Sequence, residues 1–246
     1  MDFVTFGIIL DNIVFPDGRI ARDVLGGGGV QTAFGMRLWS DAQRVGLVAN
    51  VGTDLPESVW DWLRASGVDG LGVRVSKMPT LRAWEHLDAA GRRTHLWAAP
   101  AEVVEAQLQR SLVYVPQAYH RARGFHLGLH PDSPDHNFLA DLRTLGGLVS
   151  VEPFKPADQR PTPEALRALL SAADVFSPNL NGARSLVGPG KPPELTQRLI
   201  DSGARVVALR MGAQGSFVTD AEGGRSAHIP AFPVNVHNPV GAGNAY

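Results

Sequence analysis

The chain has 246 residues, of which 44% are hydrophobic, and this is enough to bury one substantial core. Its 23 Lys and Arg residues nearly balance its 24 Asp and Glu residues, and the net charge of −1 excludes a global basic field that would attract nucleic acid or an anionic membrane. The absence of cysteine excludes disulfides, thiol catalysis and Cys-ligated zinc.

The first residues predict a buried strand, a polar segment and a glycine turn. Phe3 to Leu10 is an apolar run, and Asp11 stands at its end. Residues 12–24 are short and polar and break the pattern. Next comes Gly26-Gly27-Gly28-Gly29-Val30-Gln31-Thr32-Ala33. Glycine at such a place lets the backbone approach a bound molecule closely, although four glycines in a row are equally typical of a flexible turn without a ligand.

The following segments alternate between strand and helix patterns until residue 73. Residues 46–54 predict a strand that ends in Gly-Thr-Asp, and residues 55–67 predict a helix. Residues 73–100 break the rhythm and predict strands joined at the turn Asp88-Ala89-Ala90-Gly91. Arg82 and Glu85 lie on this segment. They are either ligand contacts or solvated surface charges, and we favour the second interpretation.

Two histidines further along invite a metal interpretation that the spacing weakens. His126 and His130 flank Leu-Gly-Leu. In a strand they would lie about 13 Å apart, at roughly 3.3 Å per residue, which is too far to share one ion. Only a turn at Gly128 would bring them together. We therefore favour a structural loop here, keep contact with a substrate as the alternative, and assign no metal ligand.

The second half of the chain returns to alternating helices and strands. Thr162-Pro163-Glu164 predicts a capped helix start, and Pro192-Pro193-Glu194 opens a second helix that ends near Gly203. The residues Asp174-Val175-Phe176 predict a short buried strand before a turn at Asn179, and residues 206–216 predict another strand with a glycine turn. This alternation is typical of a mostly parallel sheet with helices on both faces.

Ligands of such folds bind beyond the carboxyl ends of the strands. Asp11, Asn179 and Gly212 are all expected at that edge. No apolar run approaches the roughly 18 residues of a membrane span, and the start lacks the basic lead of a signal peptide, so a cytoplasmic location is the default expectation.

The last residues read Asn238-Pro239-Val240-Gly241-Ala242-Gly243-Asn244-Ala245-Tyr246. Backbone N–H groups at a glycine turn that opens a helix can hold an anion. We expect no helix here, because no residue follows Tyr246. A bare Gly-Ala-Gly is also common in ordinary turns. Neither glycine cluster fits the dinucleotide-binding fingerprint or the P-loop.

In this order and spacing, the motifs resemble the signatures of the ribokinase-like (PfkB) carbohydrate kinases. The C-terminal run is similar to Asp-Thr-x-Gly-Ala-Gly-Asp-x-Phe, so the resemblance implies that Gly241, Ala242 and Gly243 form an anion hole for the transferring phosphoryl group. It places Asn244 at the position of the catalytic base. The early glycine run is similar to Gly-Gly-x-x-x-Asn-x-Ala. The acceptor-binding residues that it implies are Asp11, Gly26, Gly27, Gln31 and, on the lid, Arg82.

The resemblance also implies a nucleotide site. Asn179 falls on the family's Asn-x-x-Glu segment, and Arg210, Gly212 and Gly215 fall on the strand and turn that border the nucleotide phosphates. ATP and Mg²⁺ are the expected cofactors.

Three family carboxylates are missing from this chain. Asn238 and Asn244 replace two Asp residues, and Gly182 stands where the Glu of Asn-x-x-Glu is expected. An amide cannot take a proton as a carboxylate does, and general-base catalysis is typically worth about 10²–10⁴-fold in rate. If another group serves as the base, Asp11 or one of the histidines is a candidate.

The resemblance implies a three-layer α/β/α sandwich with a mostly parallel central sheet and a small β-lid. We expect one ribokinase-like domain over residues 1–246, incomplete at its C-terminus, with lid segments at about 12–24 and 73–100. We expect this incompleteness to expose apolar surface. Gly-x-Gly-Asn together with Arg82-Ala83-Trp84 is associated with an uncharacterised, chiefly fungal, side branch of the family.

The expected function is MgATP-dependent phosphoryl transfer to a hydroxyl of a sugar or related polyol, impaired by the missing carboxylates. The alternative is a non-catalytic pseudokinase that senses a ligand or binds a partner. Neither nucleic acid nor membrane is an expected partner. A homodimer through the lid is a further possibility, with Trp84 and Trp97 buried either between subunits or within one.

Overall fold

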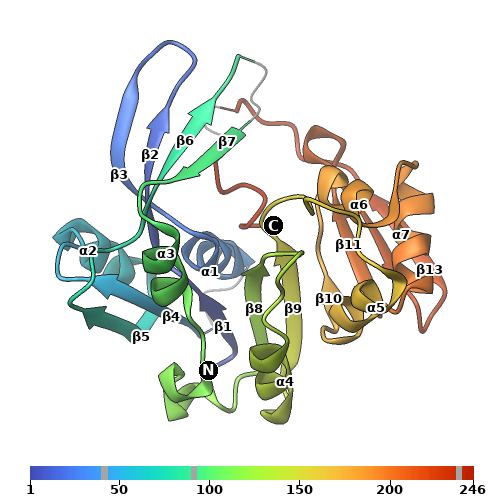
Figure 1. The fold of residues 1–246 in the computed structure, drawn as a ribbon, viewed down its shortest axis with the longest axis horizontal. Coiled ribbons are helices and arrows are strands. Elements are labelled where there is room, and N and C mark those ends of the chain that lie inside the picture. The colour runs from blue at the N-terminus through green and yellow to red at the C-terminus, as the bar shows by residue number, and fades with distance from the viewer. Residues whose placement is uncertain (40–43, 90–92, 237–239) are drawn as a thin grey trace. The chain divides into compact units, whose positions relative to one another are not determined.

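The computed structural model describes residues 1–39, 44–89, 93–236 and 240–246 (Figure 1). Contacts divide the chain into two compact units. The first unit comprises Met1–Ala122 with the C-terminal segment, and the second comprises Arg123–His237. The single domain expected from the sequence stays a prediction. Asn238, Ala90 and Gly91, which the sequence analysis named, lie outside the described residues.

The main sheet of the first unit is parallel and carries the helix that follows the four glycines. Strands β1 (Phe3–Phe6) and β5 (Asp69–Ser76) both pair with β4 (Val45–Gly52). Helix α1 (Gly28–Trp39) packs against β1 and β4. Helices α2 (Glu57–Ser66) and α3 (Ala101–Leu108) complete the unit with short 3-10 turns at Leu112–Tyr114 and Gln117–Tyr119. The buried apolar core lies between these elements and includes Val30, Ala33, Leu47, Val51, Val59 and Leu63.

A second, four-stranded sheet belongs to the same unit (Figure 1) and is named the lid sheet here, because it contains the segments that the sequence predicted as a lid. Its strands are β2 (Ile9–Val14), β3 (Ile20–Gly26), β6 (Arg82–Leu87) and β7 (Arg93–Trp97), in the order β3-β2-β6-β7. Strand β2 runs antiparallel to β3 and parallel to β6, and β6 runs antiparallel to β7. The strands of this sheet therefore come from two segments far apart in the sequence.

Two details of the predicted strands were wrong. Residues 3–10 do not form one strand, because Gly7 adopts a φ of 103°, which only glycine reaches readily, and this ends β1 before β2 begins. Asp11 therefore lies inside a lid strand and does not end a main-sheet strand. The lid is also bounded differently, since residues 73–76 belong to β5 in the main sheet and the lid strands begin at Ile9 and end at Gly26.

The second unit continues the βα pattern. Strands β8 (Gly124–Leu129), β9 (Leu148–Pro153), β10 (Val175–Phe176) and β11 (Val206–Arg210) pair in parallel, and β12 (Ser216–Asp220) and β13 (Arg225–Ile229) add an antiparallel edge. Helices α4 (His136–Thr144), α5 (Pro163–Ser171), α6 (Leu180–Val187) and α7 (Pro192–Asp201) lie between the strands in sequence. A 3-10 turn spans Gly212–Gln214.

Local sequence signals account for several helix ends. The Thr162 side chain accepts a hydrogen bond from the backbone of Ala165 and caps α5, as the sequence predicted. Helix α2 ends at Gly67, which adopts the left-handed conformation with φ of 68°. Helix α7 begins at Pro192 and is followed by Gly203, as expected. Among the described helices, none has the length and apolarity that crossing a bilayer requires.

Large apolar side chains are exposed at several places in the described part of the chain, and two of these places hold three such side chains each. Phe34, Leu38 and Trp39 project from α1, and Trp39 is 83% exposed. Phe232, Val234 and Val236 are exposed in the segment that follows β13.

Candidate functional site

The glycines before α1 allow close approach of the backbone to lid strand β2. A Cβ atom on Gly26 would overlap the Asp11 carboxylate. A Cβ atom on Gly27, whose φ is 93°, would lie 2.8 Å from the backbone nitrogen of Ile9. Glycine is therefore required at position 27, whereas a side chain at position 26 would displace the Asp11 carboxylate, and the glycine pair leaves that carboxylate beside the start of α1.

Asp11 is buried and lies on a polar face of the lid sheet. It pairs in register with Ala83, and alternation along β6 and β7 puts Glu85, His95 and Trp97 on the same face. Asp11 is only 4% exposed, and no described residue donates a hydrogen bond to its carboxylate. Burial, and secondarily the nearby charge of Glu85, raises the pKa of Asp11 to about 7. A buried carboxylate with free acceptor atoms suits the binding of a hydroxyl group.

Glu85 is not a solvated lid charge, and the favoured interpretation of this residue was wrong. It is 2% exposed. One carboxylate oxygen lies 2.6 Å from Nδ1 of His95, and the other lies 3.4 Å from Nε of Arg93. Glu85 is buried because its side chain lies on the inward face of β6. The sequence alone does not show which face of this strand is turned inward. Oε2 of Glu85 has no hydrogen-bond partner among the described residues.

Arg82 is engaged by carboxylates of its own unit. Its Nε lies 2.8 Å from Oδ1 of Asp23, and one terminal nitrogen lies 2.5 Å from Oδ2 of Asp54. Asp54 also accepts hydrogen bonds from the backbone and hydroxyl of Thr80. This network joins β3, β6 and the end of β4. The acceptor-binding role of Arg82 stays a prediction, and the guanidinium has two ionic partners without any ligand.

The C-terminal glycine run forms a tight turn. Gly241 adopts a φ of 86°, and its carbonyl oxygen accepts hydrogen bonds from the backbone N–H groups of Asn244 at 3.0 Å and Ala245 at 2.9 Å. Residues 240–246 form turns and no helix. Gly241, Ala242 and Gly243 therefore lie on a turn that is closed by these two backbone hydrogen bonds.

This turn packs on one face of α1. Nδ2 of Asn244 donates a hydrogen bond to Oε1 of Gln31 over 2.5 Å. The hydroxyl of Thr32 donates to the carbonyl oxygen of Asn244 over 2.9 Å. A Cβ atom on Gly35 would overlap the carbonyl oxygen of Ala245, so this helical glycine also serves the contact. The structure thus brings together Gln31 and Asn244, which lie 213 residues apart in the sequence.

The contacts between α1 and the turn were not predicted as such. The sequence analysis assigned Gln31 to the acceptor and Asn244 to the base position, but it did not foresee a bond between them. The signal for Thr32 and Gly35 is weak, because threonine and glycine occur in many helices that hold neither a ligand nor a docked turn. Thr32 and Gly35 follow Gln31 by one and four residues, and only this spacing places the three residues on one face of the helix.

In the second unit, Asn179 caps α6. Its side-chain oxygen accepts a hydrogen bond from the backbone N–H of Gly182 over 2.8 Å. Its nucleotide-binding role stays a prediction. Gly182 supplies no side chain, so this turn offers no carboxylate and does not fit a protein-ligated Mg²⁺ site. Mg²⁺ in kinases is held largely by phosphate oxygens and water, and the cofactor prediction depends on the nucleotide.

Arg210 belongs to a buried polar cluster on the sheet of the second unit. Its Nη1 lies 2.8 Å from Oε2 of Glu152, and Nη2 donates to the carbonyl oxygen of Ser177 over 3.0 Å. His126 lies across from Ser150, with its Nδ1 at 2.9 Å from that hydroxyl, and its Nε2 is 3.7 Å from Glu152. Nε of Arg210 has no hydrogen-bond partner among the described residues. Sequence reasoning missed Glu152.

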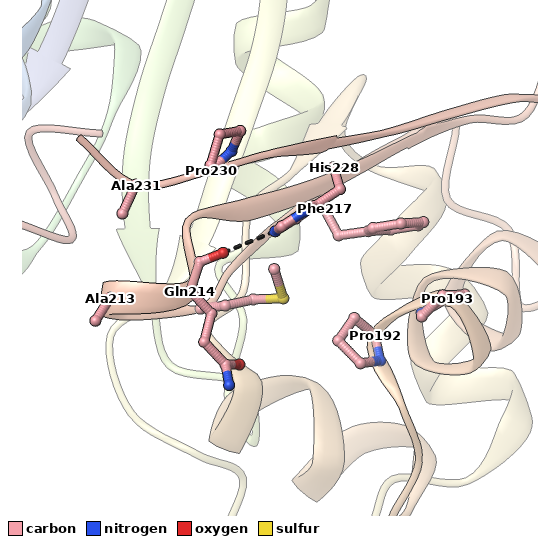
Figure 2. A pocket seen from close by; sticks show the side chains of 9 residues that line it. Pro192, Pro193, Ala213, Gln214, Phe217, His228, Pro230 and Ala231 are labelled. Carbon is pink, nitrogen blue, oxygen red and sulfur yellow. Dashed lines mark hydrogen bonds between the residues drawn. The ribbon is translucent and has the colours of Figure 1, made fainter. Parts of the chain in front are cut away.

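A shallow apolar hollow of about 570 Å³ borders the turn that contains Gly212 (Figure 2). Pro192 and Pro193 at the start of α7 form one side, and Phe217 and His228 on β12 and β13 form the other. The His228 ring is fixed by a 2.8 Å hydrogen bond to the carbonyl oxygen of Gln214. A Cβ atom on Gly215, whose φ is 82°, would overlap the carbonyl oxygen of Ile229.

The histidine pair does not converge. Gly128 lies inside β8, so the chain does not turn there. Beyond the strand, His130, Asp132 and Asp158 place ligand atoms within 4.8 Å of one another. Lys155 already lies 2.7 Å from the carboxylate of Asp158, which reduces the negative charge available to a cation. Sequence reasoning did not identify this cluster, because Asp158 is distant in sequence from the histidine.

Comparison with known proteins finds a family match over most of the chain. The profile of the pfkB family of carbohydrate kinases matches residues 15–246. A cytidine kinase of Thermococcus kodakarensis is 27% identical over the whole of this chain and 86% of its own length. An uncharacterised protein of Schizosaccharomyces pombe is 25% identical over 76% of this chain, which spans about half of that relative (53%).

Solved structures agree on the fold. A fructokinase double mutant from Vibrio cholerae, determined with fructose, ADP and potassium ion, superimposes with a TM-score of 0.78. It is 19% identical, and the alignment covers 99% of this chain and 80% of that one. The chain therefore has the ribokinase-like α/β fold, with a large and mostly parallel sheet, as the sequence predicted.

Proposed function

We propose a function from one premise, that this chain belongs to the PfkB family of carbohydrate kinases. It transfers the γ-phosphoryl group of ATP to a hydroxyl of a sugar, a nucleoside or a related polyol, and it does so slowly. The observation that carries this proposal is the contact between Asn244 on the glycine turn and Gln31 on α1. The same stretch of chain that holds Gln31 begins beside Asp11, so the predicted acceptor and phosphoryl residues are linked through one helix.

Asp11 supplies the acceptor contact in this proposal. Its buried carboxylate has no hydrogen-bond donor among the described residues, so a hydroxyl of the acceptor can donate to it. Gly26 and Gly27 keep the backbone close enough for the carboxylate to reach the start of α1. Ionised Asp11 accepts two hydroxyl hydrogen bonds more strongly than neutral Asp11 does. Acceptor binding should therefore strengthen as the pH rises through about 7, which is the pKa of this group.

The glycine turn supplies the electrostatic part of the chemistry. Backbone N–H groups of Ala242 and Gly243 are the candidates to stabilise charge on the phosphoryl oxygens. The acceptor oxygen forms a bond to the γ-phosphorus, the bond between that phosphorus and the β–γ bridging oxygen breaks, and ADP leaves with the bonding electron pair. The hydroxyl proton passes to solvent water, because the Asn244 amide has no basic site for it. This last step is the reason that we expect slow turnover.

The nucleotide side of the proposal is supported by the second unit. Gly212 and Gly215 belong to the turn after β11. Arg210 is the last residue of β11, and a backbone β-bridge joins it to Asn179. The apolar hollow next to this turn has a volume in the range of small-molecule pockets and is a candidate for the base of a nucleotide (Figure 2). Mg²⁺ would neutralise phosphate charge, and no carboxylate of α6 is available to hold it.

The acceptor class follows from the lid face and from the relatives. Trp97 and His95 are in edge-to-face contact, with ring centroids 4.6 Å apart, on the same face of the lid sheet as Asp11. An aromatic side chain beside a hydroxyl-binding carboxylate suits either a sugar face or a nucleobase. The relative named as a cytidine kinase favours nucleosides as the first acceptors to examine.

The test is transfer of radiolabelled γ-phosphoryl from ATP to a panel of nucleosides, pentoses, hexoses and polyols. We expect one acceptor class to yield a phosphate ester, and we expect Asn244→Asp to raise kcat by about 10²–10⁴-fold because it restores a general base. Asn181→Asp is the matched control, since Asn181 lies on α6 and makes none of the contacts described above. Absence of any ester from both the wild type and Asn244→Asp would overturn the proposal.

A pseudokinase remains the second candidate, and two specific residues favour it. Asn244 lacks the base and Gly182 lacks the acidic side chain that the family places there. In that case the protein binds nucleotide or polyol and signals by binding alone. Calorimetry that detects ligand binding, together with no gain of turnover in Asn244→Asp, would support this second function over the first.

A further inference from the structure

Gln31 contacts Asn244 directly, although the sequence pattern placed it at the acceptor. We infer that Gln31 is a positioning residue, which fixes the side-chain amide of Asn244 so that its carbonyl oxygen is left to receive the acceptor hydroxyl. This inference rests on the proposed kinase function and deepens it. It reassigns Gln31 from holding the acceptor to orienting the residue at the family's base position.

The geometry of the turn supports this role. Gln31 projects from the first turns of α1, which is anchored by packing on β1 and β4. Its side chain lies next to Gly241, where an added Cβ atom would be only 2.6 Å from Cδ of Gln31. Thr32 separately holds the backbone of Asn244. The main chain and the side chain of Asn244 therefore each have their own partner on α1.

The direction of the hydrogen bond leaves one atom of the Asn244 amide free. Nδ2 of Asn244 is committed to Oε1 of Gln31, at 2.5 Å. No described residue donates a hydrogen bond to Oδ1 of Asn244. An amide oxygen accepts a hydrogen bond from a hydroxyl but does not take its proton. Asn244 held in this way can aim the attacking oxygen without acting as a base.

Gln31 can also form a hydrogen bond to an aspartate carboxylate at position 244. Rotation of the Gln31 amide by half a turn exchanges its oxygen for its NH₂ group, which can donate to a carboxylate. A glutamine at position 31 thus orients either Asn or Asp at position 244. A glutamate at position 31 can accept a hydrogen bond from Asn244, but it would repel an aspartate at position 244. The effect of Gln31→Glu should therefore depend on whether position 244 is Asn or Asp.

The first experiment measures the contact without relying on catalysis. In protein labelled with ¹⁵N at asparagine, the Asn244 side-chain NH₂ signals are identified by their loss in Asn244→Asp. We expect their exchange with solvent to be slower than that of exposed Asn181 by about threefold to tenfold, as a single net hydrogen bond implies. Gln31→Leu should remove this protection, and Gln197→Leu, at an exposed glutamine of α7, should leave it intact.

The second experiment separates orientation from acceptor binding. In the Asn244→Asp background, we expect Gln31→Leu to lower kcat by about 10–100-fold with little change in the acceptor KM. The fall in kcat corresponds to the loss of one hydrogen bond to a charged group. Gln31→Glu should preserve the amide protection with Asn244 and abolish the kcat gain of Asn244→Asp. A raised KM with unchanged kcat in Gln31→Leu would overturn the inference and return Gln31 to the acceptor.

The two experiments keep the inference distinct from the proposed function. If no variant transfers phosphoryl, the kinase proposal fails, and the NMR result alone decides whether Gln31 holds the Asn244 amide. If Asn244→Asp is active but the Asn244 signals exchange equally fast with and without Gln31, the kinase proposal stands and the positioning role is wrong.

Discussion

Gly35→Ala provides a sharp test of the docking of the C-terminal turn on α1. Gly35 lies inside α1, where replacing glycine by alanine ordinarily stabilises a helix by up to about 1 kcal/mol. Here the added Cβ atom would overlap the carbonyl oxygen of Ala245 and would lie 2.7 Å from its carbonyl carbon and 2.8 Å from its Cα. These are backbone atoms, which cannot rotate away.

The expected displacement is enough to break the contact. Carbon atoms in contact lie about 3.5–4.0 Å apart, so the turn must retreat by roughly 1 Å. A shift of that size carries the bonds from Asn244 to Gln31 and from Thr32 to Asn244 beyond hydrogen-bonding distance. Each bond is worth about 0.5–1.5 kcal/mol, so the loss of about 1–3 kcal/mol cancels or exceeds the gain from helix propensity.

Gly182→Ala is the matched comparison. Gly182 is also a helical glycine, and the nearest atom to an added Cβ is Oδ1 of Asn179 at an ordinary 3.5 Å. Urea unfolding should show Gly182→Ala to be up to about 1 kcal/mol more stable than the wild type, and Gly35→Ala to be about 1–3 kcal/mol less stable than Gly182→Ala. Equal stabilisation by both substitutions, with unchanged phosphoryl transfer in Gly35→Ala, would refute docking of the turn on α1.

Three further substitutions test other parts of the site. Asp11→Asn removes a buried carboxyl whose folded pKa, about 7, exceeds its unfolded value of 3.8. Because the folded state binds this proton more tightly, wild-type stability should fall as the pH rises from about 4 to about 7, by at most a few kcal/mol, and urea midpoints of Asp11→Asn should lack this fall. Gly182→Glu adds a carboxylate in the first turn of α6, where an added Cβ atom makes only ordinary contacts, and should stabilise the protein by about 0.5–1 kcal/mol in thermal melts; a loss of stability would mean that this buried position does not accept the longer side chain. Glu152→Gln leaves the buried Arg210 without its ionic partner and should cost about 3 kcal/mol in urea unfolding, whereas an unchanged midpoint would mean that the pair contributes nothing.

Local chemistry explains what could be predicted about the fold. The capped start of α5 at Thr162 and the proline start of α7 each depend on residues within one turn, and the structure confirms them. The break at Gly7 was missed, because an apolar run through a glycine reads as one strand unless the backbone turns there. The burial of Glu85 was also missed. Which side chains of a strand point inward depends on the strands that pair with it, and these are distant in sequence.

The candidate site was predictable in its motifs and not in its contacts. The glycines beside Asp11 and in the C-terminal turn were identified from their resemblance to family signatures. Close backbone approach requires glycine at Gly27, and a positive φ favours it at Gly27 and Gly241. The bond between Gln31 and Asn244 depends on how α1 and the turn meet in space. The pairing of Arg210 with Glu152 likewise depends on strand register, which single positions in a sequence do not encode.

The most direct measurement of the central claim is phosphoryl transfer by purified Asn244→Asp beside the wild type, with labelled ATP and Mg²⁺ and cytidine among the acceptors. We predict a labelled phosphate ester in both reactions, formed about 10²–10⁴-fold faster by Asn244→Asp. Asn244→Asp that binds nucleotide and acceptor yet forms no ester would contradict the claim that the turn on α1 is a phosphoryl-transfer site.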